Sequence, residues 1–103
     1  MIEITRGTTP TVIFSFDDVR TSDITAAYMT IRQESNQAVV VKREIEDAVI
    51  DEGTVSFKLT QSDTLAVEGK AEILLNWKTA DSTRGVSKKI RAEFKKNHID
   101  KVI

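Results

Sequence analysis

The chain contains no cysteine. This absence excludes disulfide bonds, thiolate metal sites and cysteine nucleophiles together, and it argues against a small secreted module held by disulfides. Proline occurs once and glycine four times. The single proline, Pro10, cannot donate a hydrogen bond to a sheet, so we expect it at the start or on the edge of a strand. The glycines all fall where the surrounding sequence predicts a turn: Gly7, Gly53, Gly69 and Gly85.

No charge of one sign dominates the sequence, since its formal net charge is −1. The composition therefore gives no reason to expect a nucleic-acid partner. Long apolar runs are also missing, and the roughly 20 apolar residues of a membrane-spanning helix occur nowhere. The first residues, Met1–Arg6, lack the apolar segment typical of a signal peptide. With 103 residues the chain has the length of a single domain, 1–103, which we expect to fold in a cytoplasm without binding a membrane.

Residues that carry chemistry are scarce. The only histidine, His98, lies in a polar C-terminal segment with no nucleophile or orienting carboxylate fixed beside it. A phosphate-binding glycine loop, a nucleophile elbow and a paired-histidine zinc motif are all missing from the sequence. The sequence therefore predicts no enzymatic activity, no catalytic residue, no cofactor, no metal site and no small-molecule substrate.

The strongest positive pattern runs from Ala71 to Phe94. Apolar residues occupy alternate positions before and after a short polar segment, 80–85, that ends in glycine. Because strand side chains point alternately to opposite faces, the two runs predict an antiparallel hairpin with one face against a core. In this hairpin Trp77 is expected to pack against Phe94 or Ile90. The predicted apolar face consists of Ala71, Ile73, Leu75, Trp77, Val86, Ile90, Ala92 and Phe94.

The rest of the chain predicts further short strands and one helical turn. The helical turn is expected over 61–68, with Thr60 as its N-cap, Asp63 three residues later and Gly69 after its end. Leu65 is expected to close one end of the core. This pattern favours an all-β fold, namely an immunoglobulin-like antiparallel β-sandwich of about seven strands, with a small Greek-key barrel as the alternative. The upstream strands are expected over 2–4, 12–16, 27–32, 39–45 and 55–59.

Two charged clusters are the candidate interaction sites. The acidic cluster lacks the D-x-D-x-D-G spacing of a calcium loop, so we interpret it as a solvated turn; it comprises Glu44, Glu46, Asp47, Asp51 and Glu52. The basic cluster lacks the interleaved aromatic residues of a nucleic-acid surface; it comprises Lys88, Lys89, Arg91, Lys95, Lys96 and Lys101. Such opposite charges are suited to meet between copies of the chain. The predicted interaction surface consists of Glu44, Glu46, Lys88, Lys89 and Arg91.

Two segments carry a resemblance to a known family. The first is the short strand and turn at residues 2–9, Ile-Glu-Ile-Thr-Arg-Gly-Thr-Thr. The second is Leu-Thr-Gln-Ser-Asp-Thr-Leu at residues 59–65, which is followed by Gly69 and the long hairpin. Together they resemble the immunoglobulin-like N-terminal domain of upper baseplate proteins, and related small prophage tail proteins, of phages that infect Gram-positive bacteria. The resemblance implies a non-enzymatic component of the virion, whose partners are other virion proteins or further copies of itself. It brings no ligand residues with it.

A second function stays open on the residues alone. A β-sandwich of this size also suits a module that binds carbohydrate or a cell surface, for which exposed coplanar aromatic side chains would be the distinguishing feature. The chain has one tryptophan, one tyrosine and four phenylalanines, and most of them fall in phase with the predicted core. Trp77 shares the phase of Ile73 and Leu75, so we interpret it as a core residue rather than as a ligand platform.

Overall fold

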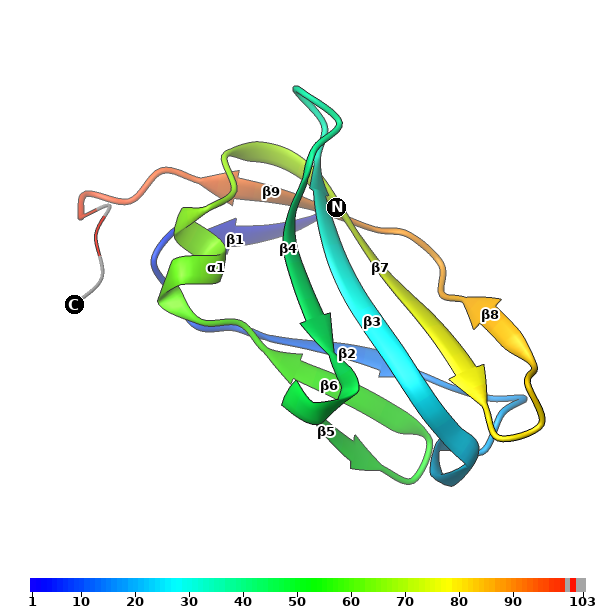
Figure 1. Cartoon of the computed structure of the whole chain (residues 1–103). Helices are drawn as coiled ribbons and strands as arrows, with labels where there is room; N and C mark the ends of the chain where they lie inside the picture. Colours follow the sequence, from blue (N-terminus) through cyan, green and yellow to red (C-terminus); the bar gives the residue numbers. More distant parts are fainter. Residues whose placement is uncertain (100, 102–103) are drawn as a thin grey trace.

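The computed structural model describes residues 1–99 and 101, and it consists mainly of strands in two sheets that pack as a sandwich (Figure 1). The larger sheet is built from β1 (Ile2–Thr5), β3 (Ile24–Gln33), β4 (Val39–Glu44), β7 (Gly69–Thr79), β8 (Arg84–Val86) and β9 (Ile90–Lys95). The smaller sheet is built from β2 (Thr11–Ser15), β5 (Ala48–Asp51) and β6 (Thr54–Lys58). Three short helical segments connect them: η1 (Thr21–Asp23), η2 (Ile45–Asp47) and α1 (Gln61–Leu65).

The strand order confirms the predicted immunoglobulin-like sandwich. The larger sheet runs β1-β9-β7-β3-β4, with β8 paired to β7, and the smaller sheet runs β2-β6-β5. In an immunoglobulin domain, strands A, B, E and D form one sheet and strands C, F and G the other. Here β2, β6 and β5 take the places of B, E and D, while β3, β7 and β9 take those of C, F and G. All pairings are antiparallel except that of β1, which lies parallel to β9 in the larger sheet. No described segment occupies the place of strand A beside β2.

Two short strands add to the predicted seven. The sequence does not identify residues 48–51 as a strand, but they form β5 and pair with β6 across a turn in which Gly53 has φ +81°. The last predicted strand is divided into β8 and β9 by residues 87–89, which belong to neither. Pro10 immediately precedes β2, as expected from its missing N–H group.

Alternate residues of both sheets fill the space between them. Phe14 on β2 and Phe57 on β6 meet edge to face, with 6.2 Å between ring centroids. Burying a large apolar side chain of this kind contributes about 1.5–3 kcal/mol before entropy is counted. The buried apolar residues are Ile4, Val12, Phe14, Ile24, Ala27, Met29, Ile31, Val41, Val55, Phe57, Leu59, Val67, Ala71, Ile73, Leu75, Ala92 and Phe94.

The predicted phase of the long hairpin is wrong at Val86, which is 58% exposed. The backbone N–H of Ser87 donates to the Leu75 carbonyl at 2.8 Å, and the Leu75 N–H donates to the Ser87 hydroxyl at 2.9 Å. Leu75 and Ile73 are two residues apart on β7, whereas the residues that face them, Ser87 and Ile90, are three residues apart. The extra residue acts as a β-bulge and reverses the alternation, so Val86 faces outward while Ile90 faces inward.

Trp77 lies at the margin of the core. Of its two predicted partners, Phe94 is wrong, whereas Ile90 lines the same groove as the indole. In the β7–β9 ladder Phe94 stands opposite Gly69, at the other end of β7, whereas Trp77 stands opposite Gly85 on β8. The indole instead meets Phe16 edge to face, with 5.7 Å between ring centroids and an interplanar angle of 74°. A Cβ atom on Gly85 would lie 2.2 Å from the Trp77 Cζ2 atom, so this glycine provides the room that the indole fills. Gly85 is therefore a packing residue inside a strand, although the sequence places it in a turn.

Helix α1 begins at the N-cap predicted from the sequence. The Thr60 hydroxyl accepts a hydrogen bond from the Asp63 N–H at 3.1 Å, and the Asp63 carboxylate accepts one from the Thr60 N–H at 3.0 Å. This reciprocal arrangement is a capping box. The same carboxylate, nearly fully buried, forms an ion pair with Arg43 on β4. The short helix is therefore joined to the edge of the larger sheet.

The prediction that Leu65 closes the core is wrong, because Leu65 is only half-buried. The helix ends at Leu65 rather than continuing to residue 68, and the chain then extends toward β7. A single turn directs Thr64 inward, and the extended segment after it buries Val67 completely. The end of the core is thus closed by Thr64 and Val67.

The two segments that carry the family resemblance contact each other. The Thr64 hydroxyl accepts a hydrogen bond from the Gly7 N–H at 2.9 Å and donates one to the Thr8 carbonyl at 2.8 Å. The Arg6 side chain donates to the carbonyls of Leu65 and Val67, at 2.6 and 3.0 Å. These contacts fasten the turn after β1 to helix α1, and they account for both segments as parts of the folding framework.

Candidate docking surfaces

The acidic cluster lies along the segment that connects β4 in the larger sheet to β5 and β6 in the smaller sheet. Glu44 ends β4, Glu46 and Asp47 belong to η2, and Asp51 and Glu52 lie at the turn between β5 and β6. Among residues 1–99 and 101, no group of three or more His, Cys, Asp or Glu side chains is placed to hold a metal ion.

Millimolar Ca²⁺ is expected to leave the melting temperature of the protein essentially unchanged. Only a ligand that binds the folded state more tightly than the unfolded state raises stability. The acidic side chains are spread along the segment between β4 and β6 rather than gathered around one point, so they offer Ca²⁺ no such site. Circular dichroism melts with and without Ca²⁺, at low protein concentration, test this. A rise of several degrees would show a calcium site in the cluster.

The basic cluster is partly neutralised within the molecule. Lys89 lies 3.6 Å from the Glu72 carboxylate, and Arg91 lies 3.3 Å from that of Glu34. Glu72 also forms an ion pair with Arg32, and at 2.9 Å it is the shortest of the three. The strand register places Arg91, Glu72 and Arg32 side by side on β9, β7 and β3, so opposite charges alternate across the outer face of the larger sheet.

The five residues of the predicted interaction surface do not meet within one molecule. Glu44 and Glu46 lie beside β4, whereas Lys88, Lys89 and Arg91 lie beside β9, and β3 and β7 stand between these strands. Glu72 on β7 lies between Arg32 on β3 and Arg91 on β9. Contact between the acidic and basic residues therefore requires a second copy, and Lys89 and Arg91 already have acidic partners of their own.

The hydrogen bond from Arg32 lowers the pKa of Glu72 below its ordinary value of 4.5, and the charge of Lys89 lowers it further against the opposing effect of desolvation. A carboxyl group whose pKa is depressed in the folded state stabilises the fold fully above its unfolded pKa, and this contribution is lost as the pH falls through the folded pKa. We therefore expect the stability difference between the wild type and Glu72→Gln to shrink as the pH falls below 4.5.

Thermal melts at a series of pH values test this expectation. Glu44→Gln serves as the control, because Glu44 is exposed and forms no ion pair among the described residues. A wild-type advantage over Glu72→Gln that stays constant from neutral to strongly acidic pH would mean that the ion pairs do not stabilise the fold.

The aromatic residues do not form a flat ligand platform. Trp77 and Phe16 pack edge to face at the core margin, as described above. Tyr28 is exposed on the outer face of the larger sheet, where the Lys42 ammonium lies 4.7 Å from its ring centroid. Tyr28 and its neighbour Ala27, which stands opposite Trp77, alternate on β3, so the tyrosine and tryptophan side chains leave the sheet on opposite faces. Both nevertheless line one shallow hollow of about 360 Å³ beside β8.

Among the described residues, one edge of β2 is unpaired and open to a partner strand. β2 pairs only with β6, and the Phe16 N–H and the Pro10 carbonyl both bond to the chain of β6 or its flanking residues. Backbone N–H and C=O groups point to alternate sides along a strand, so those of Val12 and Phe14 also point toward β6. The N–H and C=O groups of Thr11, Ile13 and Ser15 point away from β6. Among the described residues, nothing pairs with that side of β2. We call this side, formed by Thr11, Ile13 and Ser15, the β2 edge.

The β2 edge continues into an exposed apolar row on the smaller sheet. Ile13 is 59% exposed and stands opposite Ser56, which in turn stands opposite Val49, 63% exposed. All three side chains therefore lie on the outer face of the smaller sheet, in one line across its strands. Exposed β-branched residues beside an open edge are typical of surfaces that accept another strand.

A shallow groove of about 500 Å³ runs beside the β2 edge, between the two sheets. Its walls come from the end of β2 and from the β8–β9 side of the larger sheet, including Phe16, Trp77 and Ile90. Lys88 stands on one side of this groove and Asp17 and Asp18 on the other. Of the predicted interaction residues, Lys88 is the one that the structure brings beside the β2 edge.

The sequence interpretation missed Ile13, because it assigned the alternate positions Val12, Phe14 and Phe16 to the core and treated the residues between them as solvated. The available signal was an apolar residue at an outward position, which breaks the expected alternation of a half-buried strand. Val49 gives the same signal on β5. Such breaks in alternation mark candidate docking residues, although they do not indicate which strand edge is open.

Among residues 1–99 and 101, no helix has the length and apolar character needed to span a bilayer. No family model, curated protein or solved structure matches the chain.

Proposed function

We propose that this chain is a non-enzymatic structural module that acts by docking to other proteins through its strand edges and charged faces. The observation that carries the proposal is the β2 edge, which offers unpaired backbone groups beside exposed Ile13 and Val49. Main-chain hydrogen bonds to such an edge supply affinity, and the side chains around it select the partner. The alternating ion pairs on the larger sheet supply a second, polar surface.

We further propose that the module belongs to the tail or baseplate of a phage, with other virion proteins as partners. The support for this assignment is the resemblance carried by residues 2–9 and 59–65, together with a fold of the implied class. The protein would then be made in the bacterial cytoplasm and reside in the assembled particle. No nucleic acid, membrane or small-molecule substrate enters this role.

Mass spectrometry of purified phage particles tests this assignment. Phage production is induced in the bacterium that encodes the chain, and particles are separated from soluble proteins by density-gradient centrifugation. We expect peptides of this chain to sediment with the particles at a constant ratio to the major tail proteins. Recovery only in the soluble fraction, from a culture that produces particles, would contradict the assignment.

A further inference from the structure

We propose that β2 of one molecule pairs with β2 of a second copy, in antiparallel orientation around a two-fold axis at Ile13. The three-stranded sheet β2-β6-β5 would then continue into the same sheet of the second copy and form one six-stranded sheet. This inference deepens the proposed function and rests on it, because it names the edge and one partner that a docking module would use.

The β2 edge is free because the N-terminal strand is held elsewhere. β1 pairs with β9, where Ile4 is buried in the core. The Arg6 N–H donates to the Lys95 carbonyl at 2.9 Å, and the Arg6 side chain donates to the Leu65 carbonyl. Moving β1 to the place of strand A beside β2 would break these contacts. The chain's own N-terminal segment therefore leaves the β2 edge open in the folded molecule.

The β2 edge also lacks the features that protect strand edges from pairing. Protected edges commonly carry lysine, proline or a bulge. The outward residues here are Thr11, Ile13 and Ser15, and none of them is charged. Pro10 gives no protection to this edge, because its backbone carbonyl faces the other way, toward the chain that follows β6. By contrast, the free edge strand β4 carries charged residues at exposed positions, including Lys42 and Glu44.

The register follows from the requirement that every outward backbone group finds a partner. With the axis at Ile13, Ile13 faces Ile13 of the second copy, and Thr11 faces Ser15 of the second copy. In each of these pairs the two facing residues exchange backbone hydrogen bonds. The outward N–H and C=O groups of all three residues therefore find partners in both copies. The apolar row then continues from Val49 through Ser56 and Ile13 to the corresponding residues of the second copy.

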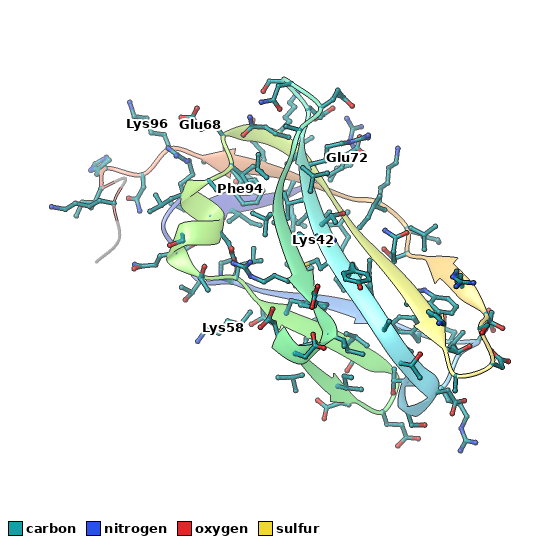
Figure 2. The ribbon with its side chains drawn as sticks, in the orientation of Figure 1. Lys42, Lys58, Glu68, Glu72, Phe94 and Lys96 are labelled. Atoms are coloured by element: carbon teal, nitrogen blue, oxygen red, sulfur yellow. The ribbon has the colours of Figure 1, made fainter. Side chains whose placement is uncertain are left out.

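Charge complementarity favours a second copy of this chain as the occupant. In this register Asp17 of the second copy comes opposite Thr9, and Lys58 lines the same shallow hollow as Thr9. Figure 2 shows Lys58 directed outward from β6. Neither Asp17 nor Lys58 has an ion-pair partner among the described residues. Lys58 stands opposite Thr11, two residues along the strand from Thr9. The two-fold axis therefore places these opposite charges in the same region twice, once at each end of the paired strands.

The pairing is expected to be weak in dilute solution. β2 has five residues, so the paired strands bury much less than the roughly 1,200 Å² at the lower end of specific interfaces. The contact is therefore best detected by trapping it. Because the chain has no cysteine, a single introduced thiol reports on one position at a time.

Disulfide trapping of Ile13→Cys tests the proposal. Directly opposite residues of a hydrogen-bonded antiparallel pair have Cα atoms about 5.5 Å apart, within the range that a disulfide spans. At high protein concentration and low salt, we expect Ile13→Cys to form a covalent dimer at least about tenfold faster than Val49→Cys, because only position 13 meets its own symmetry mate within disulfide reach. Val49 is the matched control, since it is equally exposed and lies in the same row on the same face.

The register has its own test. Thr11→Cys and Ser15→Cys should each fail to form dimers alone, because each residue lies about 13 Å along the strand axis from its symmetry mate. A mixture of the two variants should form the heterodimer. Ile13→Cys that reacts no faster than Val49→Cys would overturn the proposal, and so would equal dimer formation at all these positions.

The two proposals fail separately. If the chain occurs in phage particles but Ile13→Cys does not form dimers selectively, then the β2 pairing is wrong and the docking role stands with a different partner. If selective dimers form but the chain is absent from particles, then the phage assignment is wrong and the pairing stands. Circular dichroism of each cysteine variant confirms that it is folded before either comparison is made.

Discussion

Arg43→Ala is expected to lower the free energy of unfolding by about 3 kcal/mol, at the low end of the range for breaking a buried ion pair. The Asp63 side chain is 4% exposed and that of Arg43 is 33% exposed. Removing the arginine leaves a buried carboxylate whose remaining hydrogen bond comes from the Thr60 N–H. Water that reaches the space of Arg43 offsets part of the loss, which places the expected value at the low end.

Chemical denaturation of three variants measures this effect. Asp63→Ala should cost at least as much as Arg43→Ala, because it also removes the capping box of α1. The double variant should cost less than the sum of the two single variants, since both remove the same pair. Glu44→Ala, the next residue on β4 and exposed, should cost under about 0.5 kcal/mol. A cost below about 1 kcal/mol for Arg43→Ala would show that the pair contributes no more than a surface salt bridge.

Trp77→Ala is expected to destabilise the fold by about 3 kcal/mol, at the low end of the scale for truncating a large aromatic core residue. The indole packs against Phe16 and fills the space above Gly85, but it lies at the margin of the core and is only half-buried. Its removal opens a cavity that the neighbouring glycine cannot fill. Equilibrium unfolding in denaturant measures the loss.

Lys78→Ala is the control for this measurement, since Lys78 is the next residue on β7 and faces the other side of the sheet. It should cost under about 0.5 kcal/mol. The wild-type tryptophan should show acrylamide quenching between that of a buried and that of a free indole. Full quenching together with a mild effect of Trp77→Ala would mean that the tryptophan is a surface residue, and it would revive the carbohydrate-binding alternative.

Features set by neighbouring residues could be predicted from the sequence. The capping box of α1 depends on Thr60 and Asp63, three residues apart, and the N-terminus of the helix was therefore correct. Alternation along Ala71–Trp77 is likewise local, and it identified the inward face of β7. The sandwich followed from the number and spacing of such strands.

Features set by pairing between distant segments could not be predicted. The bulge at residues 87–89 depends on how Ser87 bonds to Leu75, and it reversed the predicted phase of Val86. Residues 48–51 became a strand because β6 pairs with them. The ion pair between Arg43 and Asp63 joins residues far apart along the chain, and no local pattern indicates it.

The candidate docking surface belongs to this second group. Ile13 is visible in the sequence as an outward apolar residue, but whether its backbone is free depends on where β1 pairs. A parallel pairing of β1 with β9 leaves the β2 edge open, whereas pairing with β2 would have covered it. The choice between them rests on tertiary contacts of Ile4 and Arg6 with the larger sheet and helix α1.

Amide hydrogen exchange along β2, followed by NMR in dilute solution, is the most direct test of the open edge. The N–H groups of Val12 and Phe14 bond within the sheet and should be protected, whereas those of Thr11, Ile13 and Ser15 should exchange nearly as fast as in an unfolded chain. Protection that alternates residue by residue is therefore the expected result. Protection of Ile13 and Ser15 that equals that of Phe14 and does not weaken on further dilution would show that the edge is covered within the single molecule, and it would contradict docking through β2.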